Sequence, residues 1–82
     1  MYTLMMAQSF LLINCFNKSD DVKEKLMEIS NIKEVKPVMG AYDYVVKFED
    51  MSKTKLQKLI RNEIRPIENI RSTLTLNTKH QN

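Results

Sequence analysis

The chain has 82 residues, of which 43% are hydrophobic and 28% are charged, and its formal net charge is +3. This length permits one small domain with a marginal core, and the composition excludes intrinsic disorder. A single cysteine and a single histidine exclude an internal disulfide and a Cys/His zinc site, so self-association is the expected source of additional stability. The net charge is too small for a dedicated nucleic-acid-binding domain.

The opening segment carries no charge before Lys18. It lacks the basic start of a secretory signal and the roughly 20 apolar residues of a membrane span, so we expect a cytoplasmic protein without a membrane segment. Residues 1–7 should be a ragged start, and the apolar run at residues 10–16 predicts a β-strand. Cys15 in this strand should be reduced and buried, as a small hydrophobic residue.

A helix and a second strand follow. Ser19 is a suitable N-cap, and apolar residues recur at helical spacing between about residues 20 and 30. Residues 33–38 predict a strand that lies at the edge of a sheet or carries a bulge, because Pro37 has no N–H to donate to a neighbouring strand.

The second half of the chain begins at a hairpin. Gly40, the one glycine, should permit a tight turn into a third strand at residues 44–48. Ser52 should cap a second helix that ends near Arg65, because a proline follows. Clean alternation over residues 71–77 predicts a fourth strand.

The predicted order is βαββαβ, and its two halves resemble each other. An Ile-x-Asn-Ile turn follows each helix, at residues 29–32 and again at residues 67–70. Two such halves with right-handed crossovers predict an α+β, ferredoxin-like fold with a four-stranded antiparallel sheet and both helices on one face. We expect one domain over residues 1–82, with its core at about residues 7–78 and the first and third strands at the centre of the sheet.

The two central strands are apolar at nearly every position. A sheet with one solvated face should instead alternate apolar and polar residues. Because the helices can cover only one face, we expect a second copy of the chain to cover the other. The sequence therefore predicts a homodimer that packs sheet on sheet into an α/β barrel.

Few residues suit catalysis or metal binding. His80 lies in a tail, residues 79–82, that should fray, and Cys15 has no neighbouring histidine to activate it. We therefore expect no enzyme activity, no cofactor and no metal site. The six methionines are soft ligands that suit copper, but they form no spaced motif, and methionine is commoner as core filler.

RNA-recognition motifs share the βαββαβ order and display aromatic residues from their central strands. Residues 40–48 are similar to the third-strand signature of that motif, but Met39 replaces its basic residue and Asp43 brings a negative charge towards phosphates. The second helix also carries four cations at three- or four-residue spacing: Lys55, Lys58, Arg61 and Arg65. A solvated helix face is the usual explanation of this spacing, so RNA binding is kept only as an alternative.

Two short motifs carry a resemblance to a known family. Gly-Ala-Tyr-Asp at residues 40–43 joins two predicted strands, and Ser-Thr-Leu-Thr at residues 72–75 lies in the last one. In this order and spacing they resemble the effector-binding (RAM) domain of the leucine-responsive/asparagine-operon (Lrp/AsnC) transcription regulators, over about residues 7–78. The family's usual helix-turn-helix domain is not in this sequence, so the resemblance implies a stand-alone version.

The resemblance implies that dimers assemble into rings, commonly octamers or decamers, and bind amino-acid effectors between dimers. The chain would act in transcription regulation, with a full-length Lrp/AsnC regulator as one partner. Pocket residues carried over from the family motifs are Gly40, Tyr42, Asp43, Ser72, Thr73 and Thr75.

Within this set, Asp43 would bind the ammonium group of the effector, and the hydroxyls would bind its carboxylate. Met39 and Tyr42 would favour an apolar or amphipathic effector. Turn geometry and β-propensity explain the same residues without a ligand. An assembly domain without a ligand is therefore the alternative function.

We expect no sequence-specific DNA binding by this chain alone, because it lacks a helix-turn-helix and its net charge is only +3. A gel-shift assay at about 0.15 M salt should show no preference for one sequence over random competitor. A footprint on one sequence that survives the competitor would contradict this expectation.

Overall fold

The computed structural model of the chain describes residues 8–17 and 20–78. Expectations about residues 1–7, Ser19 and the tail with His80 lie outside the described residues. The strands are β1 (Gln8–Cys15), β2 (Ile32–Pro37), β3 (Tyr44–Phe48) and β4 (Ile70–Thr78). The helices are α1 (Asp20–Met27) and α2 (Lys53–Leu59), and α2 continues into a π-helical turn, η1 (Ile60–Ile64).

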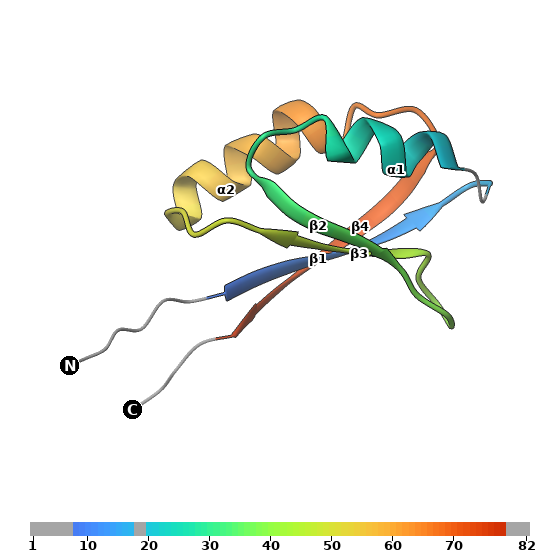
Figure 1. Cartoon of the computed structure of the whole chain (residues 1–82), viewed down its shortest axis with the longest axis horizontal. Helices are drawn as coiled ribbons and strands as arrows, with labels where there is room; N and C mark the ends of the chain where they lie inside the picture. The colour runs from blue at the N-terminus through green and yellow to red at the C-terminus, as the bar shows by residue number, and fades with distance from the viewer. Residues whose placement is uncertain (1–7, 18–19, 79–82) are drawn as a thin grey trace.

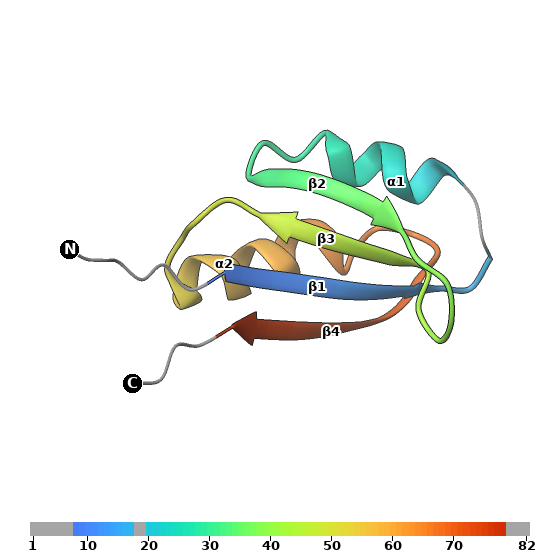
Figure 2. The same cartoon turned by 60° about the horizontal axis from the view of Figure 1, so that its bottom comes forward.

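The four strands form one antiparallel sheet in the order β2-β3-β1-β4. Both helices lie on the same side of this sheet (Figure 1). After a 60° turn, α1 is seen beside β2, and α2 lies behind the half of the sheet that contains β1 (Figure 2). The predicted ferredoxin-like fold is therefore confirmed, including the central position of β1 and β3.

Local signals in the sequence set several element boundaries. The Ser52 hydroxyl accepts a hydrogen bond from the Lys55 N–H, at 3.1 Å, and so caps α2 as expected. Pro37 is the last residue of the edge strand β2, where its missing N–H leaves no gap within the sheet. Pro66 follows directly after Arg65, the C-cap residue of η1.

The two Ile-x-Asn-Ile turns have the same hydrogen-bond pattern. In each, the N–H of the second isoleucine donates to the carbonyl of the first, Ile32 to Ile29 at 3.1 Å and Ile70 to Ile67 at 3.3 Å. The second turn also contains Asn69 at φ 81°, a left-handed conformation that asparagine tolerates better than most residues. The sequence repeat is therefore a structural repeat.

One expectation needs correction. The sequence predicts a uniform α-helix up to Arg65, but its last turn is π-helical, with the Arg65 N–H donating to the Ile60 carbonyl at 2.8 Å. The apolar residues that the periodicity assigns to this turn are nevertheless buried, since Ile60 is 8% exposed and Ile64 is fully buried. The apolar periodicity therefore does not distinguish an α-turn from a π-turn here.

The core lies between the helices and one face of the sheet. Val46, Leu11 and Thr75 form one row across β3, β1 and β4, and Tyr44, Ile13 and Thr73 form the next. The four β1 and β3 residues in these rows are buried against apolar residues of both helices. Because every second residue of a strand faces the same side, this register fixes what the opposite face presents.

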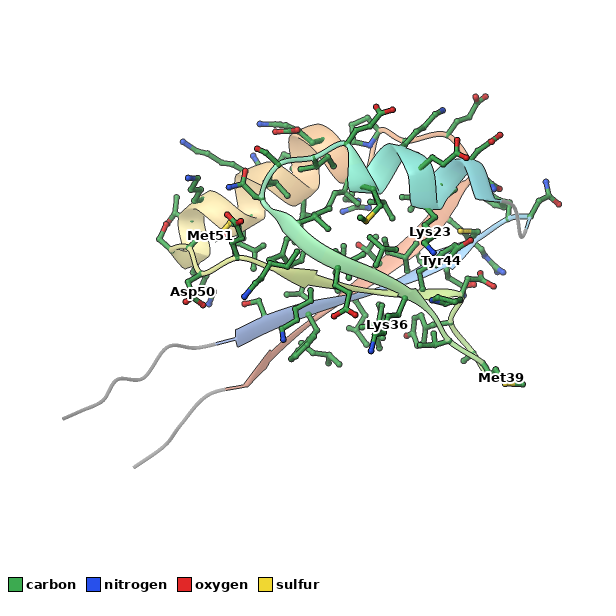
Figure 3. The ribbon with its side chains drawn as sticks, viewed as in Figure 1. Lys23, Lys36, Met39, Tyr44, Asp50 and Met51 are labelled. Carbon is green, nitrogen blue, oxygen red and sulfur yellow. The ribbon has the colours of Figure 1, made fainter. Side chains whose placement is uncertain are left out.

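The opposite face of the sheet, here called the outer face, is covered by no described element. Its row through Leu12 joins Lys36, Val45, Leu12 and Leu74, and its row through Phe10 joins Glu34, Lys47, Phe10 and Leu76. Leu74 and Leu76 are each 44% exposed. Lys36 points away from the helices on this face (Figure 3) and pairs with Glu34 at 3.4 Å. The predicted second apolar face is therefore present.

Neither α1 nor α2, nor the turn η1, is long and apolar enough to cross a membrane, and this holds for the described part of the chain.

Candidate functional site

The hairpin that joins β2 to β3 supplies three of the predicted site residues. The Val38 N–H donates to the Asp43 carbonyl at 3.0 Å, which closes a loop of four intervening residues. Gly40 in this loop has φ 105°, a conformation that a residue with a Cβ rarely adopts. Met39 is 95% exposed and projects from the body of the molecule at the tip of the loop (Figure 3). The loop is therefore free to contact another molecule.

Asp43 fastens this hairpin to the end of β1. Its backbone N–H donates to the Ile13 carbonyl at 2.8 Å, and its carboxylate Oδ2 accepts from the Cys15 N–H at 2.8 Å. Burial raises the pKa of the Cys15 thiol, and the nearby Asp43 carboxylate raises that pKa further. Cys15 therefore stays a neutral thiol near neutral pH, which suits a core residue rather than a nucleophile.

The three hydroxyl residues of β4 do not share one face. Thr73 and Thr75 belong to the rows that face the helices, whereas Ser72 is paired with Asn14 and points to the outer face. Ile13 is fully buried and lies between Thr73 and Tyr44 in its row, so the core separates the threonines from the hairpin. Within one chain, the six predicted residues are therefore divided among the hairpin, the helix side of β4 and the outer face.

A hollow of about 440 Å³ opens between β4 and the second helix. Its walls come from α2, from η1 with its C-cap and from β4: Gln57, Ile60, Arg61, Arg65, Thr73 and Thr75. Ligand pockets commonly measure about 300–1,000 Å³, so this hollow is large enough for an amino acid. Five of its six lining residues have side chains that can donate hydrogen bonds, and two of these residues are arginines, so the lining is suited to an anion.

Sequence reasoning did not place Gln57, Arg61 or Arg65 in a ligand site. The two arginines were visible only as part of a basic helix, which suggested nucleic acid or a solvated face. The structure divides that helix, because Lys55 and Lys58 line a separate hollow with Asn31, Leu59, Asn62 and Glu63. The spacing of the four basic residues therefore indicated a basic helix. It did not show which of the four lie beside β4.

A further hollow of about 470 Å³ lies at the end of the sheet. Asn69 spans it by accepting from the Asn17 N–H at 2.8 Å and donating to the Asn17 carbonyl at 2.6 Å. Its other lining residues are Phe16, Asp21, Lys25 and Glu68. The lining contains both acidic and basic residues, and the Asn69 amide is already bonded to the Asn17 backbone. This hollow therefore does not favour a ligand of one charge. Among the described residues, no group of three or more potential ligands could hold a metal ion.

Replacing Asp43 should destabilise the protein even without a ligand. Asp43→Ala removes the acceptor of the partly buried Cys15 N–H, so the free energy of unfolding should fall by about 1–3 kcal/mol. Asp43→Asn keeps an oxygen acceptor and should lose less. Urea titration followed by circular dichroism measures both changes, with Asp50→Ala as the control at an exposed carboxylate. Equal stability of Asp43→Ala and Asp50→Ala would show that the bond contributes nothing.

Comparisons with known proteins agree with this geometry. Residues 8–80 match the family model described as the Lrp/AsnC ligand binding domain. The crystal structure of FFRP-DM1 is 31% identical, with a TM-score of 0.76, and the match covers 92% of this chain and all of that one. A hypothetical protein of Pyrococcus horikoshii is also 31% identical, with a TM-score of 0.79 and 93% of both chains covered.

AsnC of Escherichia coli is 26% identical, with a TM-score of 0.82, over 92% of this chain and 52% of the AsnC chain. This chain thus spans about half the length of that regulator. A search of curated proteins found no match. The family model covers nearly the whole chain and two solved structures share 31% of its sequence, so the chain belongs to the Lrp/AsnC family as a ligand-binding domain with the ferredoxin-like fold.

Proposed function

We propose that the chain is a sensing and oligomerisation module for a small molecule, with an amino acid as its effector, and that it acts in transcription regulation. The observation that carries this proposal is the hollow between η1 and β4. It brings hydrogen-bond donors from two elements to one space, including Thr73 and Thr75, which the family motif nominated independently. No catalytic activity is assigned, because Cys15 stays a neutral thiol and the hollow holds no nucleophile paired with a base.

Self-association is part of this proposal. The outer face exposes a band of apolar side chains on β1 and β4, with Leu74 and Leu76 each 44% exposed, and β2 borders it with Lys36 and Glu34. Covering this band with the same band of a second copy removes apolar area from water, and a two-fold axis makes the surface self-complementary. The dimer we propose packs these two sheets face to face into an α/β barrel.

A second kind of contact would complete the ligand site. Gly40, Tyr42 and Asp43 lie in a hairpin that the core separates from Thr73 and Thr75 of the same chain. A hairpin from a neighbouring dimer could close the hollow of this chain, so that the site forms between dimers in a ring of eight or ten subunits. Ser72, on the outer face, would then contribute to the dimer interface and not to the hollow.

A cytoplasmic location and a full-length Lrp/AsnC regulator as partner complete the proposed setting. Direct DNA binding by this chain is not part of it. The alternative is an assembly module whose ligand site is vestigial. RNA binding is less favoured, because Tyr44 and Phe48 are buried towards the helices and are not displayed on the outer face.

Binding of an effector should be visible as thermal stabilisation. A ligand at one hundred times its dissociation constant stabilises the folded state by about 2.7 kcal/mol, and each kcal/mol raises Tm by about 4–8 °C in a domain of this size. We expect at least one of the common amino acids, at millimolar concentration, to raise Tm.

The double variant Thr73→Val, Thr75→Val should abolish that rise, because it removes both hydroxyls and retains β-branched side chains. Thr54→Val, at an exposed position of α2, is the control and should preserve it. If no amino acid raises Tm, the assembly module without a ligand becomes the better account.

A charge on the outer face should break the proposed dimer. Leu74→Glu places a carboxylate in the apolar band, so sedimentation velocity at low micromolar concentration should show a smaller species than the wild type. Met27→Glu makes the same kind of change on α1, at a residue that is 51% exposed compared with 44% for Leu74, and should leave assembly unchanged. A folded wild-type monomer, or an unaltered assembly in Leu74→Glu, would contradict the proposed interface.

A further inference from the structure

The hollow between η1 and β4 has an unbalanced charge. Arg61 and Arg65 both line it, and none of its lining residues is acidic. In the described part of the chain neither guanidinium takes part in an ion pair, since the ion pair found there joins Lys36 to Glu34. Two basic residues therefore line one hollow that has no acidic residue in its lining.

The surrounding groups extend this preference for anions. Thr73 and Thr75 can donate hydroxyl hydrogens from the strand side, and Gln57 can donate amide hydrogens from α2. Ile60 is the one apolar side chain in the lining and is only 8% exposed, so an apolar side chain of a ligand would find little surface to cover. The exposed Met39, which the sequence suggested as an apolar wall, does not line the hollow.

Arginine pairs with carboxylates through two parallel N–H···O bonds, which makes each guanidinium a specific partner for one carboxylate. An amino acid with an uncharged side chain has one carboxylate and leaves one of the two guanidiniums unmatched. A ligand with two carboxylates separated by a short carbon chain can engage both. The π-helical turn contributes here, because it carries Arg61 and ends at the C-cap Arg65 on the side of the helix that faces β4.

We infer that the effector is a dicarboxylate of amino-acid size, that is, an acidic amino acid or its deaminated counterpart. One carboxylate binds Arg61 and the other binds Arg65, with the two threonine hydroxyls donating to the same oxygens. This inference rests on the proposed function and narrows it from amino acids in general to one charge class. Glutamate and glutarate share the two carboxylates and differ in the ammonium group. Comparing their affinities therefore distinguishes an acidic amino acid from a deaminated dicarboxylate as the ligand.

The test is isothermal titration calorimetry at constant ionic strength with L-glutamate, L-aspartate, glutarate, L-glutamine, L-leucine and inorganic phosphate as probes. Glutamate or aspartate should bind at least about tenfold more tightly than glutamine, which has the same shape as glutamate and one carboxylate fewer. Binding of glutarate as tight as that of glutamate would show that the ammonium group is not read, and would still support the two-carboxylate site.

Paired charge variants locate the binding. Arg61→Gln with Arg65→Gln should weaken glutamate binding at least about tenfold, whereas Lys55→Gln with Lys58→Gln removes two charges from the other hollow of the same helix and should not. All four side chains are exposed, so circular dichroism should show that both variants stay folded.

The outcomes separate this inference from the proposed function. Tight binding of leucine or glutamine without binding of glutamate would overturn the charge class and leave an amino-acid sensor. Binding of phosphate in place of the dicarboxylates, or glutamate binding that survives loss of both arginines, would overturn the inference as well. If glutarate binds and no amino acid does, the dicarboxylate site stands and the amino-acid effector of the proposed function fails. If neither glutarate nor any amino acid binds, both fail.

Discussion

The structure depends on one constraint, which is that the central strands of the sheet carry apolar side chains on both faces while the described helices cover only one (Figure 1). Leu11, Ile13 and Val46 are fully buried on the helix side. On the other side, Leu12 and Val45 remain partly exposed between the leucines of β4 and the charged residues of β2. A chain of 82 residues has a marginal core, so an uncovered apolar face is a cost that association removes.

Strand β4 links this constraint to the ligand hollow. Its residues alternate, so that Leu74 and Leu76 lie on the outer face while Thr73 and Thr75 face α2 and η1. A shift of β4 by one residue would exchange the two sets and remove both surfaces at once. A ligand that orders β4 from the helix side would therefore also order the proposed interface, and by linkage assembly would raise ligand affinity.

Much of this fold could be predicted from particular residues. Four residues occupy the kind of position that their chemistry favours. Ser52 caps a helix and Gly40 adopts a positive φ in a turn. Pro37 ends an edge strand, and Pro66 follows the end of a helix. The two turns of the Ile-x-Asn-Ile repeat could be matched because each uses the same backbone bonds. Short-range preferences and apolar periodicity are sufficient for these features.

The candidate ligand site was harder to predict, because it depends on the face of the sheet or helix on which each side chain lies. The family resemblance grouped Ser72 with Thr73, although neighbouring residues of a strand point to opposite faces. The apolar pattern does not distinguish the π-turn from an α-turn. It therefore could not predict that Arg61 and Arg65 lie beside β4. Asp43 was recognised, but its bond to the Cys15 N–H depends on residues far apart in the sequence.

The central claim is that the outer face of one subunit packs on the outer face of another. Isotope-filtered NMR on a mixture of methyl-labelled and unlabelled protein tests it directly, because intermolecular contacts then report on the interface alone. The account predicts intermolecular NOEs from the methyl groups of Leu12, Val45, Leu74 and Leu76. NOEs confined to methyl groups of the helices, or the absence of any intermolecular NOE in the assembled protein, would contradict it.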